Sequence, residues 1–143
     1  MKTEIQSAIK AALKNQDKVR LETLRGVLSA MQYEEIERKV EQLPIDVALG
    51  VCQREIKKRK EEMEFAEKAN RPELIGKLQV EISVLEELLP AQLSAETLKE
   101  LLNSLKAGNP SLNMGLAMKS LKETHAGQYD AKLASELAKQ IFG

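Results

Sequence analysis

The sequence is poor in the residues on which most catalytic and metal sites depend. Among its 143 residues there are one histidine, one cysteine and no tryptophan. Cys52 has no partner for an intramolecular disulfide, and a single cysteine and a single histidine cannot supply the ligands of a structural zinc site. A phosphate-binding glycine loop and the G-x-S-x-G nucleophile motif are also absent. We therefore expect a binding module, with no catalytic, cofactor-binding or metal-binding residue.

An excess of one charge is missing as well. Twenty-two Lys and Arg residues balance 22 Asp and Glu residues, so no net field draws the molecule to nucleic acid or to an anionic membrane. Any RNA contact must come from a local basic patch. Aromatic residues make up only 3% of the chain, which leaves little scope for stacking on bases.

Long apolar runs are also lacking. No stretch of about 18 apolar residues is present to span a bilayer. The first 15 residues, "MKTEIQSAIKAALKN", are amphipathic and do not contain the continuous apolar centre of a secretory signal. We expect a soluble cytoplasmic protein.

Helical periodicity, in contrast, runs along nearly the whole chain. Apolar residues recur at i, i+3, i+4 and i+7, and no segment alternates as a strand does. The predicted inward positions include Leu13 in the first helix and Ile45 in the third. Helix starts are expected near residue 5, at Asp17, Pro44, Pro72, Ser94 and Met114, and after Asp130. The pattern predicts an all-α fold.

The helices change in length near Pro90. Four longer helices come before the segment "LLPAQLS", and three shorter ones follow it. We therefore predict an N-terminal four-helix domain over residues 1–92 and a C-terminal three-helix domain over residues 93–143.

The run "REIKKRKEEMEF" in the third helix is basic at first and then acidic. At 100° per residue, Arg54, Lys57 and Lys58 point away from the apolar stripe of that helix. Acidic side chains lie close by on the same helix, so this basic strip is interpreted mainly as a solvated face. RNA contact through it is a secondary interpretation.

One arginine of the same run, Arg59, falls within the apolar stripe. On the second helix, Glu35 lies in line with the apolar residues as well. Because a charge removed from water needs a partner, we predict an ion pair between Glu35 and Arg59 with a structural role, which Glu81 could share.

Two further residues could suggest catalysis. Cys52 lies on an apolar helix face, which is typical of a small buried thiol. His125 comes near the end of the sixth helix, next to Gly127, where a histidine usually serves at a helix C-terminus or in a core. We therefore interpret both residues as structural and not as a nucleophile or a base.

The order of these elements resembles the YqeY-like, or GatB/YqeY, family. The resemblance rests on three blocks: "LETLRGVLSAMQYEEIE", "REIKKRKEEMEFAEKANRPELIGKLQVEISVLEELLPAQLS" and "NMGLAMKSLKETHAGQYDAKLASELAKQ". Such proteins are similar to the tail of the B subunit of the glutamine-dependent aspartyl/glutamyl-tRNA amidotransferase. The resemblance implies two all-helical parts and a tail that helps to engage tRNA without an active site.

The resemblance also implies where RNA contacts would lie. By position, the candidate contacts are Met114, Gly115, Lys119, Lys122, Gly127, Lys132 and Lys139. Three functions stay open at this point. The first is a tRNA-associated accessory module, and the second is an adaptor for a protein partner such as an amidotransferase or a translation component. The third is a carbon–nitrogen ligase activity with glutamine as amido-N donor, as in the larger relatives.

Overall fold

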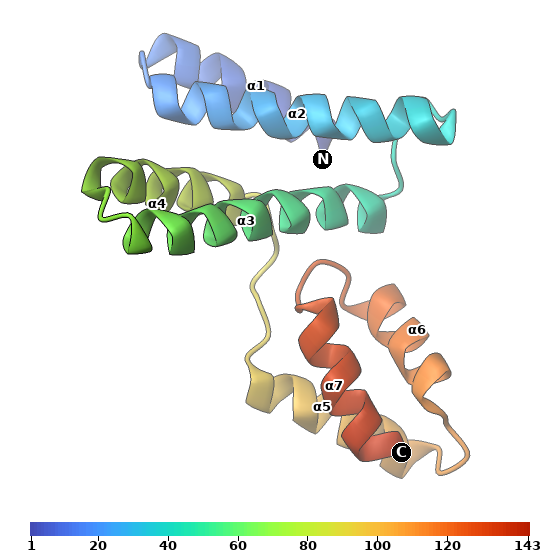
Figure 1. The fold of residues 1–143 in the computed structure, drawn as a ribbon. Coiled ribbons are helices and arrows are strands. Elements are labelled where there is room, and N and C mark those ends of the chain that lie inside the picture. Colours follow the sequence, from blue (N-terminus) through green and yellow to red (C-terminus); the bar gives the residue numbers. More distant parts are fainter. The chain divides into compact units, whose positions relative to one another are not determined.

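The computed structural model describes all residues from 1 to 143 and contains seven α-helices and no strand (Figure 1). The helices are α1 (Lys2–Lys14), α2 (Lys18–Arg38), α3 (Ile45–Lys68), α4 (Pro72–Glu86), α5 (Ala95–Gly108), α6 (Met114–Thr124) and α7 (Ala131–Phe142). The predicted all-α fold class is confirmed.

The chain divides into two compact units. Unit 1 comprises Met1–Leu89 with α1 to α4, and unit 2 comprises Pro90–Gly143 with α5 to α7. That residues 1–92 and 93–143 are domains able to fold separately stays a prediction.

Short polar side chains start several of the helices. Asp17, Ser94 and Asp130 each accept a hydrogen bond from a backbone N–H in the first turn, at 3.2, 3.1 and 2.9 Å. Each of these bonds satisfies a donor that has no partner within the helix, which is why these residues start helices. Pro44 differs slightly from its predicted place, because it precedes the first helical residue of α3 and forms the N-cap.

The helices of unit 1 form two antiparallel hairpins, α1 with α2 and α3 with α4 (Figure 1). Three residues at the ends of helices have left-handed backbone: Gln16, Lys39 and Asn70, with φ of 55°, 57° and 53°. This conformation lets the chain reverse directly after a helix. Asparagine adopts it more readily than glutamine or lysine does.

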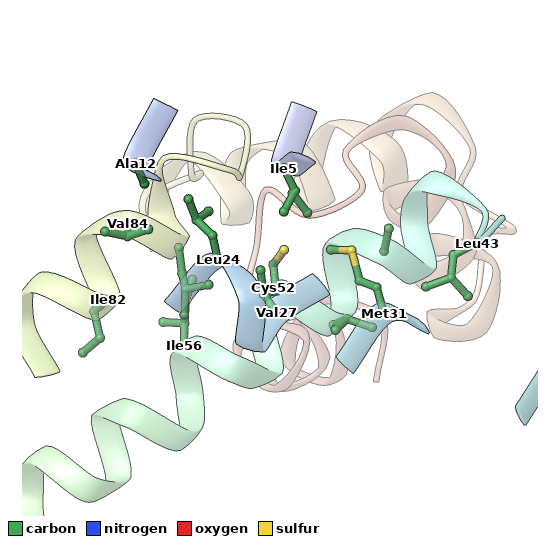
Figure 2. Packing of buried hydrophobic residues seen from close by; sticks show 13 residues of the cluster. Ile5, Ala12, Leu24, Val27, Met31, Leu43, Cys52, Ile56, Ile82 and Val84 are labelled. Carbon is green, nitrogen blue, oxygen red and sulfur yellow. The ribbon is translucent and has the colours of Figure 1, made fainter. Parts of the chain in front are cut away.

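The core of unit 1 receives side chains from all four helices (Figure 2). Ile5, Leu24, Cys52 and Leu85, one from each helix, are at most 1% exposed. Burying one large aliphatic side chain stabilises the fold by roughly 1.5–3 kcal/mol, so this shared core accounts for the association of the two hairpins.

Two of the predicted inward positions are wrong. Leu13 is 51% exposed and Ile45 is 58% exposed. Both lie at or next to the end of a helix, where no neighbouring turn covers the side chain. A periodic pattern marks the face of a helix but does not show how far along the helix the partner extends.

Unit 2 has a smaller core built around α7. Its fully buried side chains are Leu98 and Leu102 of α5, Ala117 and Leu121 of α6, and Ala134 and Ala138 of α7. The two alanines of α7 are short, so they allow close contact between α7 and its two neighbours.

Candidate nucleic-acid interface

Three of the candidate RNA contacts form one exposed stripe on α6. Gly115, Lys119 and Lys122 are spaced by four and three residues and therefore share a face of the helix. The buried residues of α6, Ala117 and Leu121, lie on another side. The stripe therefore faces solvent, and its first position, Gly115, carries no side chain.

The beginning of α6 is fixed by Asn113. Its Oδ1 accepts a hydrogen bond from the backbone N–H of Leu116 at 2.9 Å. A Cβ added at Gly115 would lie 3.5 Å from the same Oδ1, which is ordinary van der Waals contact. The helix therefore does not itself require glycine at this position.

Met114 has a structural role. Its side chain is half-buried and packs against the core of unit 2. The neighbouring Leu116, in contrast, is 51% exposed and places an apolar side chain beside the stripe.

Gly127 lies in the turn between α6 and α7, where its φ of 72° favours glycine. Its carbonyl accepts a hydrogen bond from Gln92 Nε2 at 2.6 Å. The next carbonyl, of Gln128, accepts one from the backbone N–H of Leu93 at 2.7 Å. Gly127 therefore belongs to a turn that holds the segment before α5.

The lysines of α7 form a second stripe. Lys132 and Lys139 are seven residues apart on one exposed face, and Glu136 lies between them on the same face. The acidic Asp130 caps this helix. The four candidate lysines are thus shared equally between α6 and α7. No acidic residue stands between the two lysines of α6, and Glu123 follows directly after Lys122.

His125 terminates α6 as the sequence predicted. Its backbone N–H donates to the carbonyl of Leu121 at 2.8 Å, and its Nδ1 lies 2.7 Å from Thr124 Oγ1. No carboxylate or second histidine pairs with the ring, so these contacts describe a helix cap.

The basic strip of α3 is partly neutralised by neighbouring acids. Arg54 contacts Glu34 of α2 at 3.1 Å, and Lys58 contacts Glu55 at 3.6 Å. Hydrogen bonds from Arg38 and then Arg54 hold the pKa of Glu34 below its usual range. These contacts are those of a solvated face with local ion pairs.

The predicted pair between Glu35 and Arg59 is wrong, although both side chains do point inward. Glu35 is 7% exposed and pairs with Lys2 of α1, whose Nζ lies 3.0 Å from Glu35 Oε1. Arg59 lies 3.6 Å from Glu55 and 3.8 Å from Glu81, and it donates to the carbonyl of Glu55. Glu81, considered as a shared partner, therefore does neighbour the arginine.

The reason is the register of two antiparallel helices. Arg54 faces Glu34, so positions further along α3 face earlier positions of α2. Arg59 Nη2 accordingly lies 4.0 Å from where a Cβ of Gly26 would stand. Gly26 precedes Glu35 by nine residues, about 13 Å along a helix axis, which is too far for the predicted contact.

Cys52 is completely buried in unit 1, and burial followed by the charge of Glu55 raises the pKa of its thiol to about 12. A thiol of this kind is a packing group and not a nucleophile.

No cluster of three or more His, Cys, Asp or Glu side chains is arranged to hold a metal ion. No helix is long and apolar enough to cross a membrane.

A family model described as Yqey-like protein matches residues 2–142, which is nearly the whole chain. The chain belongs to the YqeY-like family. No curated protein matches it. Within this YqeY-like chain, sequence reasoning also missed the hydrogen bond between Gln92 and Gly127. The only signal for it was the presence of two turn-rich segments, "PAQLS" and "HAGQYD".

Proposed function

We propose that this chain is a non-catalytic accessory module that associates with tRNA through its C-terminal unit. The observation that carries the proposal is the α6 stripe, where Lys119 and Lys122 share an exposed helix face and the first acidic residue, Glu123, comes after both lysines. Lys132 of α7 adds a third exposed cation. Family membership supports the proposal through the resemblance described above between YqeY-like proteins and the tRNA-engaging tail of the amidotransferase B subunit.

The physical basis of binding would be charge. Lysines that neutralise phosphates release condensed counterions, so log K falls with log salt by about 0.7 to 0.9 per phosphate. Three contacts correspond to a slope of roughly −2 to −3. With aromatics at 3% of the chain, stacking contributes little, and the shape of the tRNA would matter more than its sequence.

The test is a salt titration of tRNA binding by three proteins. Replacing Lys119, Lys122 and Lys132 together with glutamate is expected to abolish most of the affinity and to flatten the salt slope. The matched control reverses Arg54, Lys57 and Lys58, three cations of unit 1, and is expected to have a smaller effect. Circular dichroism checks that each variant keeps its helicity.

Each other outcome selects a different interpretation. Loss of affinity only in the Arg54, Lys57 and Lys58 variant would move the site to α3. Binding by the wild type that is absent, or independent of salt, would exclude RNA.

The second candidate is an adaptor for a protein partner. It is favoured by Leu116, which is 51% exposed beside Gly115 on the same helix that carries the two lysines. An apolar side chain beside a basic stripe fits an acidic protein surface with an apolar depression. Replacement of Leu116 by serine separates the two candidates, because it would weaken a protein complex and leave the salt slope of tRNA binding unchanged.

A further inference from the structure

The face of α3 that points away from the core of unit 1 carries exposed charges in a definite order. At 100° per residue, seven exposed residues lie within about 60° of one line along the helix. In chain order they are Arg54, Lys57, Lys58, Glu61, Glu64, Phe65 and Lys68. We call them the outer face of α3. Its first half is basic, and its second half is mainly acidic with one aromatic side chain.

Several of these charges have no partner within the chain. On the outer face of α3, Arg54 pairs with Glu34 and Lys58 pairs with Glu55. Lys57, Glu61 and Glu64 are exposed and form no ion pair. Arg54 and Lys58 remain 62% and 71% exposed despite their pairs.

The outer face also holds one of the most exposed large apolar side chains of the protein. Phe65 is 72% exposed, at the acidic end of the face. Charges segregated by sign together with an exposed aromatic ring are features of a surface that recognises a partner of complementary charge.

We propose that the partner is the outer face of a second copy of this chain, in an antiparallel and two-fold symmetric pair. We place the two-fold axis level with Lys60. A residue that precedes Lys60 in one copy then faces the residue that follows Lys60 by about the same number of positions in the other copy. Lys57 and Lys58 of one copy then lie against Glu64 and Glu61 of the other. Arg54 reaches the ring of the other copy's Phe65, where a cation–π contact forms.

The charge pattern selects this arrangement over a parallel one. In a parallel pair, the basic halves would face each other and repel. The whole chain has no net charge, so no long-range repulsion opposes the approach of two copies. One helix face buries less than the ~800 Å² per partner of a standard interface, so the pair is weak and strengthens at low ionic strength.

Sedimentation of the full-length chain over a range of concentrations tests the proposal. The wild type is expected to self-associate at low salt and to be monomeric at high salt. The variants K57E/K58E and E61K/E64K each place like charges opposite one another and are expected to weaken association by about tenfold or more. The fourfold variant K57E/K58E/E61K/E64K exchanges the signs of these four charges, so that opposite charges face each other again, and it is expected to restore association.

The fourfold variant has the same net charge as the wild type, so its recovery reports the pairing and not the overall charge. A matched control, Lys10→Glu with Lys14→Glu on the exposed side of α1, changes the net charge as K57E/K58E does and is expected to leave association unchanged. Circular dichroism confirms that all variants are folded. A monomeric wild type at low salt, or a folded fourfold variant that stays monomeric, overturns the proposal.

Discussion

Lys2 of α1 and Glu35 of α2 form an ion pair of 3.0 Å in which the two ends are buried to different extents. The side chain of Lys2 is 31% exposed and that of Glu35 is 9% exposed. The pair lies beside a pocket of about 100 Å³ whose lining includes Met31, Leu43 and Ala48. The lysine can still be hydrated if the pair is broken, whereas the carboxylate cannot be hydrated to the same extent.

This difference predicts unequal effects of the two single substitutions. Lys2→Met leaves a nearly buried carboxylate without its cation and is expected to cost about 1–2 kcal/mol of unfolding free energy, less than a fully buried pair because the site is partly open. Glu35→Gln is expected to cost less. Urea unfolding of both variants and of the double variant K2M/E35L provides the measurement. Equal losses for the two single variants would show that the burial of Glu35 has no energetic consequence.

The guanidinium of Arg20 in α2 binds the carboxylate of Glu87, just after α4, at 2.7 and 3.2 Å. The hydrogen bond from Arg20 lowers the pKa of Glu87 below its ordinary value of 4.5. A carboxyl with a lowered pKa contributes stability above its unfolded pKa and loses it as the pH falls through the folded value.

We therefore expect Glu87→Gln to destabilise unit 1 at pH 7 by about 0.5–1 kcal/mol, because the pair is exposed. The difference between wild type and variant should disappear as the pH is lowered well below 4.5. Thermal unfolding across this pH range measures it. A difference that persists in strong acid would assign the effect to packing instead of charge.

The thiol of Cys52 should be unreactive in the folded protein. Its pKa of about 12 leaves almost no thiolate at pH 8, and the side chain is fully buried. We expect reaction with a disulfide reagent to be at least ~100-fold slower in native buffer than in denaturant. A Cys52→Ala protein with an added cysteine at the exposed Ser7 is the control and should react rapidly in both conditions.

Two glycines of unit 2 should respond in opposite ways to alanine. Gly127→Ala forces a side chain into left-handed backbone, at a cost of about 1 kcal/mol. Gly115 lies in helical backbone, and an added Cβ there makes only an ordinary contact with Asn113. We therefore expect Gly115→Ala to leave the stability of unit 2 unchanged or to raise it slightly. Thermal unfolding decides both. If Gly115→Ala leaves stability unchanged but weakens tRNA binding, then the absence of a side chain at position 115 lets the ligand approach the helix closely.

Local features of the fold could be predicted from the sequence. Asp17, Ser94 and Asp130 start helices because each satisfies a backbone donor only two or three residues away. The inward directions of Glu35 and Arg59 could also be read from periodicity, since the side chain follows the helical repeat.

Contacts between distant segments could not be predicted in this way. Glu35 meets Lys2 and not Arg59 because of how far each helix is displaced along its neighbour. The hydrogen bond between Gln92 and Gly127 spans 35 positions. Periodicity gives the direction of a side chain around the helix axis, but not the position along that axis at which a neighbouring helix makes contact. A loop sequence likewise does not indicate which other loop it will contact.

The small core of unit 2 has a consequence for its response to a partner. Leu98, Leu102 and Leu121 are the large side chains among its fully buried residues, and alanines supply the rest. Such a core gives a narrow margin of stability, so the amides of α5, α6 and α7 should exchange with deuterated solvent through frequent local opening. A molecule that binds only the folded form suppresses that opening by mass action. The amide exchange rates of these three helices would therefore report on binding, because exchange becomes slower as the partner binds more strongly.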